Sequence, residues 1–144
     1  MSYSKILISV DSSEYSITAA KKGLELAHTL SAKVALLYVI DISKAMGNVD
    51  AGIGPEEALL ILKKEALQTL EQLSSYNGSG LEKLMPEGHP KDDILKSAET
   101  WGADLIVVGT HGRTGLSHLL IDSTAEYIVR HSKIPVLVVP TPVK

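Results

Sequence analysis

The chain has 144 residues, with 14 Lys and Arg against 17 Asp and Glu, so its formal net charge at pH 7 is −3. The length fits a single domain spanning residues 1–144, and 44% hydrophobic with 22% charged residues excludes general disorder. The absence of cysteine excludes a disulfide framework, a thiolate metal site and a cysteine nucleophile. The slight acidity and the lack of Phe argue against a nucleic-acid partner.

The N-terminal apolar run is too short for a signal peptide and is followed by the acidic Asp11. Apolar stretches such as Ile134–Val139 fall far below the roughly 20 residues that a membrane helix needs. We therefore expect a cytoplasmic protein with no membrane partner.

Short aliphatic runs alternate with segments of helical periodicity along the chain. The aliphatic runs predict four strands: Ile6–Val10, Val34–Ile40, Leu105–Val108 and Val136–Val139. A fifth strand is predicted at Leu81–Glu87, where apolar and charged residues alternate without a clean face. The periodic segments predict four helices: about Ser13 to Leu30, Pro55 to Asn77, Pro90 to Gly102, and Ser123 to His131. The apolar stripe of the first helix includes Leu30, and the last helix carries the apolar residues Ala125, Ile128 and Val129.

This alternation of strands and helices predicts the α/β fold class. Strands that are apolar along their whole length need both faces covered, which is typical of parallel sheets. We therefore expect an open, five-stranded parallel sheet with helices on both faces. The long polar segment Ile42–Gly54 is either a solvated connection or a lid.

Three features follow the ends of predicted strands, where ligands bind in open parallel sheets. Asp11 follows the first strand, the segment Tyr38–Asp41 ends the second, and the glycine-rich segment 109–124 follows the fourth. Gly109 and Gly112 would let a ligand approach the backbone closely. Ser123 with Glu126 matches a capping box, so the last helix would start at a phosphate-binding N-terminus. Each feature also has a plain explanation: the glycines as turn formers, and Asp11 as a helix cap.

The chain resembles the universal stress protein family along nearly its whole length. The segments that carry this resemblance are Lys5–Asp11, Ala32–Ile40, Glu87–Pro90, Ala103–Arg113 and Ser132–Val139. The resemblance implies an adenine nucleotide alpha hydrolase-like fold with flavodoxin-like layering and strand order 3-2-1-4-5. It also implies a homodimer formed through the C-terminal strand Val136–Val139.

The ATP-binding branch of that family carries Gly, two residues, Gly, nine residues, and then Gly followed by Ser or Thr. Gly109, Gly112 and Ser123 match this motif, whereas Asp122 stands where the motif has its third glycine. Two like charges about 4 Å apart cost on the order of 4 kcal/mol at an effective dielectric constant of about 20. A micromolar site is worth only about 8 kcal/mol in total. An unmitigated Asp122 carboxylate beside the phosphates would therefore remove much of the affinity.

Several arrangements would relieve this repulsion at Asp122. Its side chain could point to solvent, or Arg113 could neutralise it. It could also hold Mg²⁺ or Mn²⁺ bridging to phosphate oxygens, since these ions prefer oxygen ligands. Alternatively, Asp122 only complements the dipole of the helix that follows and no nucleotide is bound.

The resemblance implies a role for individual residues. Asp11 would accept hydrogen bonds from the ribose hydroxyls, and Val39 would meet adenine through its backbone. The residues implied around the ribose and phosphates are Gly109, His111, Gly112, Arg113, Ser123 and Thr124. No catalytic residue is predicted, because a Walker lysine is lacking.

The sequence allows three functions, of which we favour the first. The first is a stress-response regulatory module that binds ATP, or ADP or AMP, and signals to an unidentified protein partner. The second is a protein-interaction dimer of the non-nucleotide branch, which Asp122 favours. The third is a slow metal-dependent ATPase.

Overall fold

Five strands form the main sheet of the computed structural model, which describes residues 3–77, 80–110 and 123–140. The strands are β1 (Lys5–Ser9), β2 (Lys33–Leu37), β4 (Leu81–Leu84), β6 (Leu105–Gly109) and β7 (Val136–Val139). Their order is β4-β2-β1-β6-β7, and every neighbouring pair is parallel. This confirms the predicted parallel sheet and its strand order.

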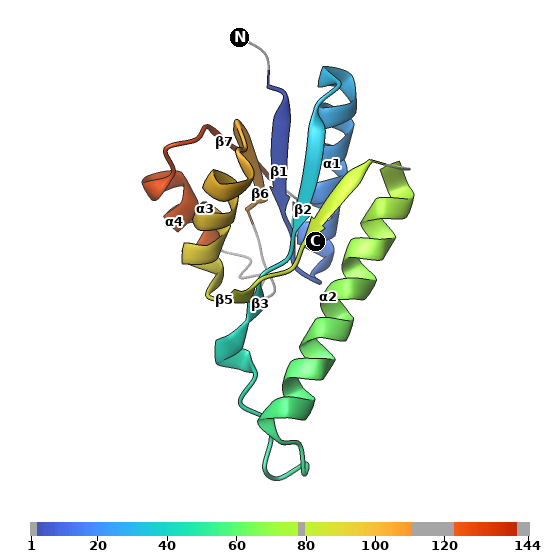
Figure 1. The fold of residues 1–144 in the computed structure, drawn as a ribbon, viewed down its shortest axis with the longest axis vertical. Helices are drawn as coiled ribbons and strands as arrows, with labels where there is room; N and C mark the ends of the chain where they lie inside the picture. The colour runs from blue at the N-terminus through green and yellow to red at the C-terminus, as the bar shows by residue number, and fades with distance from the viewer. Residues whose placement is uncertain (1–2, 78–79, 111–122, 141–144) are drawn as a thin grey trace.

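Two helices cover each face of the sheet (Figure 1). α1 (Glu14–Leu30) and α2 (Pro55–Asn77) lie on one face, and α3 (Pro90–Trp101) and α4 (Ser123–His131) lie on the other. Within the described ranges, no helix has the length and apolar character needed to span a membrane.

The central strand β1 supplies both hydrophobic cores through the alternation of its side chains. Ile6 and Ile8 pack with α1 and α2, whereas Leu7 packs with α3 and α4. All three are 0–1% exposed. A strand that is buried on both faces must be apolar throughout, which explains the unbroken aliphatic run in the sequence.

α1 lies within the predicted bounds of about Ser13 to Leu30, but Ser13 rather than Asp11 is its N-cap. Ser13 caps the helix, since its hydroxyl accepts a hydrogen bond from the Ser16 N–H at 3.1 Å. Ser31 ends it in the left-handed conformation, with φ of 54°. The predicted inward position of Leu30 is wrong, since this side chain is 37% exposed. Among the apolar residues of α4, Ala125 and Ile128 are buried, whereas Val129 is 49% exposed.

The second predicted strand is shorter than expected. β2 ends at Leu37, and the next residues form β3 (Ile40–Asp41), which pairs with β5 (Glu87–Gly88) in a separate two-stranded sheet. The predicted strand Leu81–Glu87 divides in the same way. Its break contains Pro86, which has no N–H to donate to a sheet. The Pro86 carbonyl instead accepts the Ile40 N–H at 2.8 Å.

The predicted loop Ile42–Gly54 contains regular structure. It starts with a 3₁₀ helix, η1 (Ile42–Lys44), and continues to an antiparallel bridge between Asn48 and Ile53. Together with the first turns of α2, this segment forms an arm (residues 42–61) that extends beyond the sheet at the bottom of Figure 1. Several of its large apolar side chains are exposed, including Met46 at 77% and Val49 at 93%, whereas Leu59 packs against the core.

Asp104 ties the beginnings of β1 and β6 together. Its carboxylate accepts the N–H groups of Ser4 at 2.9 Å and Lys5 at 3.1 Å, together with the Ser4 hydroxyl at 3.0 Å. Burial alone would raise the pKa of Asp104, but the hydrogen bonds from Ser4 and Lys5 outweigh it and lower the pKa below 3.8.

We expect Asp104→Asn to destabilise the protein at neutral pH but not in strong acid. The folded-state pKa is lowered, so the ionised Asp104 stabilises the fold above its unfolded-state pKa of 3.8. This contribution disappears as the pH falls through the folded-state pKa. Urea unfolding at pH 7, 5, 4 and 3 should therefore show a wild-type advantage that shrinks below about pH 4. The exposed Asp50→Asn is the control, and a gap that is equal at every pH would contradict the prediction.

Candidate functional site

The strand order reverses at β1, which defines a crevice at the carboxyl end of the sheet. The chain passes from β1 through α1 to β2 on one side, whereas β6 pairs with β1 on the other. Ile8 is paired with Val107 and Ser9 with Leu37. Continuing this register brings the residues after β1 level with Gly109 at the end of β6. Ligands of open α/β sheets bind at such a position.

Asp11 follows β1 and is held by its own turn. One carboxylate oxygen, Oδ1, accepts the Ser13 N–H at 2.8 Å. The Asp11 N–H donates to the Ser16 hydroxyl at 2.7 Å. Among the described residues, no donor reaches the other carboxylate oxygen. The turn therefore fixes the backbone of Asp11 and leaves one oxygen for a ligand hydroxyl.

Val39 lies in the break between β2 and β3, on the neighbouring strand end. The N–H groups on either side of it, those of Tyr38 and Ile40, donate to the carbonyls of Leu84 at 2.9 Å and Pro86 at 2.8 Å. The Val39 side chain is 9% exposed and packs on the α3 and α4 face. These bonds hold the Val39 backbone at the strand end.

Gly109 ends β6 opposite Val139 of β7, and the next residue, Thr110, is 7% exposed. The Thr110 N–H donates to the Val139 carbonyl at 3.2 Å. The predicted site residues that lie outside the described residues are His111, Gly112, Arg113 and Asp122.

Ser123 and Thr124 begin α4, which packs against α3 and β7. Ser123 is exposed and Thr124 half-buried. The capping-box prediction is wrong about Ser123, because it is the first helical residue rather than the cap. The predicted partner Glu126 pairs instead with Arg130 at 3.1 Å, one helical turn further on.

A carboxylate that was not predicted from the sequence lies beside the crevice. Glu65 of α2 accepts hydrogen bonds from the Ser12 hydroxyl at 3.1 Å and the Tyr38 hydroxyl at 3.2 Å. A signal was present in the sequence, since Glu65 lies three residues after Leu62 and next to Ala66 on the inward stripe of α2. A charged residue at the border of an apolar stripe is often paired.

The described residues contain no group of three His, Cys, Asp or Glu side chains arranged to hold a metal ion. The predicted metal ligand Asp122 lies outside these residues.

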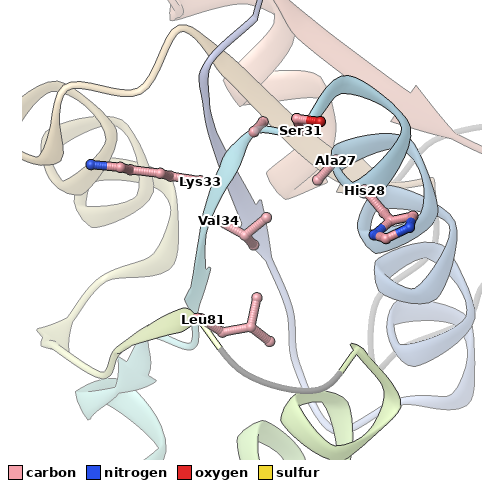
Figure 2. A pocket seen from close by; sticks show the side chains of 8 residues that line it. Ala27, His28, Ser31, Lys33, Val34 and Leu81 are labelled. Atoms are coloured by element: carbon pink, nitrogen blue, oxygen red, sulfur yellow. The ribbon is translucent and has the colours of Figure 1, made fainter.

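A cavity of about 390 Å³ lies at the other end of the molecule (Figure 2). It is bounded by the last turn of α1 and the first residues of β2 and β4. Figure 2 shows Lys33 pointing away from Leu81 and His28. The carbonyl end of α1 disfavours anions, so we do not place the nucleotide there.

The fold and the strand-end crevice define a doubly wound α/β protein whose ligand is expected where the strand order reverses. The sequence matches the model of the universal stress protein family over residues 2–140. This chain therefore belongs to the universal stress protein family.

Individual relatives agree with this assignment. Universal stress protein MJ0531 of Methanocaldococcus jannaschii is 38% identical over 144 residues, covering 99% of this chain and 85% of that protein. The solved structure of MJ0577 has a TM-score of 0.85 at 31% identity and covers 100% of both chains.

Two more distant solved structures share the fold. A universal stress protein in complex with cAMP has a TM-score of 0.68 at 22% identity, covering 97% of this chain and 98% of that one. One from Archaeoglobus fulgidus in complex with dAMP has a TM-score of 0.66 at 19% identity, covering 96% and 98%.

Proposed function

We propose that this chain is a cytoplasmic, single-domain stress-response module that binds ATP, or ADP or AMP, in the crevice between the ends of β1 and β6. The observation that carries the proposal is Asp11, whose turn leaves one carboxylate oxygen facing no donor among the described residues. A ribose offers two adjacent hydroxyl donors that suit this acceptor. The fold accommodates adenine nucleotides, since the distant structures named above hold cAMP and dAMP.

The other contacts are proposed from the family motif. The Val39 backbone would meet adenine, and the backbone N–H groups of the glycine-rich segment would cradle the phosphates. The proposed phosphate and ribose contacts are Gly109, His111, Gly112, Arg113, Ser123 and Thr124. Asp122 would hold Mg²⁺ or Mn²⁺ against the phosphates, which would convert a repulsive carboxylate into a ligand.

We expect ATP to bind in the micromolar range only when the metal is present. Calorimetric titration of nucleotide-stripped protein, with Mg²⁺ or with a chelator, tests this directly. Removing the metal should weaken ATP binding at least tenfold, because Asp122 would then face the phosphates uncompensated. Asp122→Gly should restore metal-independent binding.

Two outcomes would contradict parts of this proposal. Metal-independent binding by the wild type would remove the metal role of Asp122 but leave the nucleotide site. No heat from the wild type, with binding by Asp122→Gly, would show that Asp122 closes the site. The second candidate function, a protein-interaction module without nucleotide, would then take its place.

We also propose a homodimer through β7. This strand is an edge of the described sheet, and its Leu137 is 38% exposed. An apolar edge strand favours pairing with another strand. Light scattering at micromolar concentration should give twice the chain mass of 15.4 kDa, and a monomer mass would overturn the dimer.

A further inference from the structure

One oxygen of Glu65 joins the ends of two neighbouring strands. Glu65 Oε1 accepts the hydroxyl of Ser12, which follows β1, and the hydroxyl of Tyr38, which follows β2. The two bonds are 3.1 and 3.2 Å long. A single acceptor on α2 therefore connects both segments.

Each partner of Glu65 is a direct chain neighbour of a proposed nucleotide contact. Ser12 follows Asp11, and Tyr38 precedes Val39. Tyr38 is only 6% exposed, so its hydroxyl is held inside the fold and is directed to Glu65. Moving Ser12 or Tyr38 would shift the proposed ribose or adenine contact.

The helix that carries Glu65 is firmly attached to the core. Ala66 and Leu70 are 0% and 1% exposed and belong to the core beneath α1 and α2. The Thr69 hydroxyl donates to the Glu65 carbonyl at 3.0 Å. The Glu65 side chain thus starts from a fixed backbone, which is what a positioning group requires.

We propose that Glu65 is a positioning residue that holds the Asp11 turn and the end of β2 at a fixed separation. The crevice is then preorganised, and a nucleotide need not order it on binding. The consequence for affinity rests on the proposed nucleotide binding, whereas the consequence for the Asp11 turn does not.

The test compares Glu65→Ala with Glu65→Gln. Glutamine keeps an acceptor oxygen at the same place, so both hydroxyls retain their partner. We expect Glu65→Ala to weaken ATP binding in the presence of Mg²⁺ about five- to tenfold, and Glu65→Gln to stay within about twofold of wild type. Equal losses in the two variants would contradict positioning through these bonds.

A double-mutant cycle separates positioning from general damage to the fold. Ser12→Ala and Tyr38→Phe should each weaken binding in the wild-type background. Neither should do so in the Glu65→Ala background, because the acceptor is already gone. Effects that add fully would overturn the shared role of the Glu65 oxygen.

Hydrogen exchange tests the same role without nucleotide. The backbone N–H groups of Ser13 and Ser16 report on the Asp11 turn, since they donate to Asp11 and Ser13. We expect both to exchange faster in Glu65→Ala and at the wild-type rate in Glu65→Gln. The control Glu71→Ala removes an exposed carboxylate from the same helix and should change nothing.

The two readouts distinguish the failure of each proposal. Unchanged exchange in Glu65→Ala would overturn the positioning role, whatever the affinities are. Faster exchange together with no ATP binding by the wild type would keep the positioning role and reject the nucleotide site.

Discussion

Leu36→Ala should lower the free energy of unfolding by about 2–5 kcal/mol. Leu36 lies in β2, is 0% exposed, and packs in the core beneath α1 and α2. Truncation would remove buried apolar surface and leave a cavity that the strands on either side of β2 cannot close. Urea unfolding followed by circular dichroism measures the loss as a lower midpoint with an unchanged slope.

Leu67→Ala is the control for this truncation. Leu67 is 46% exposed on α2, so the same atoms are removed where little surface is buried. We expect a change of about 0.5 kcal/mol or less, because alanine also has the higher helix propensity. Equal losses in the two variants would contradict the assignment of the core.

Asp11→Ala should weaken ATP binding by about 10- to 150-fold. A hydrogen bond to a charged group contributes about 1.5–3 kcal/mol, and each 1.4 kcal/mol corresponds to about a factor of ten. The variant would also remove the acceptor of the Ser13 N–H. This hydrogen bond, 2.8 Å long, holds the turn. Calorimetric titration with ATP and Mg²⁺ gives the affinity.

Asp11→Asn separates the two roles of this side chain. Asparagine retains an oxygen that can accept the Ser13 N–H but loses the negative charge and one acceptor. The affinity of Asp11→Asn for ATP should lie between the affinities of the wild type and Asp11→Ala. Its melting temperature should stay near that of the wild type. Wild-type affinity in Asp11→Ala would show that Asp11 does not contact the nucleotide.

The sheet could be predicted because its signals are local. Four of the five strands of the main sheet are short aliphatic runs, β4 with its Glu82 and Lys83 being the exception, and alternation with helices leaves few possible orders. The break after β2 could not be predicted, because Tyr38 and Ile40 donate to Leu84 and Pro86, more than 40 residues further along the chain. Aliphatic character alone extends the predicted strand to Ile40. This residue is buried like those of β2, although it lies beyond the end of that strand.

The buried face of a helix could be predicted from the apolar periodicity in the middle of the helix but not at its ends. Leu24 and Ala27 are buried as the periodicity of α1 requires, whereas Leu30, the last residue of the helix, is 37% exposed. Val129 of α4 is adjacent to the buried Ile128, and a nine-residue helix offers too few repeats to separate the two.

The candidate site also contains residues that could be predicted from the sequence and one that could not. Asp11, Val39 and Gly109 follow strand ends, so their convergence needs only the strand order. Glu65 belongs to a helix whose rotation about its axis depends on packing. Its two hydroxyl partners come from other segments, and no spacing in the sequence links them.

The arm has a practical consequence for spectroscopy. Asn48 and Ile53 close a small turn with two backbone bonds of 2.7 and 2.8 Å, and the four residues between them are exposed. Because the chain has no cysteine, Ala51→Cys would create its single thiol. A fluorophore or spin label attached there would touch neither buried cluster. It would report whether the environment of the arm changes when ligand is added at the crevice.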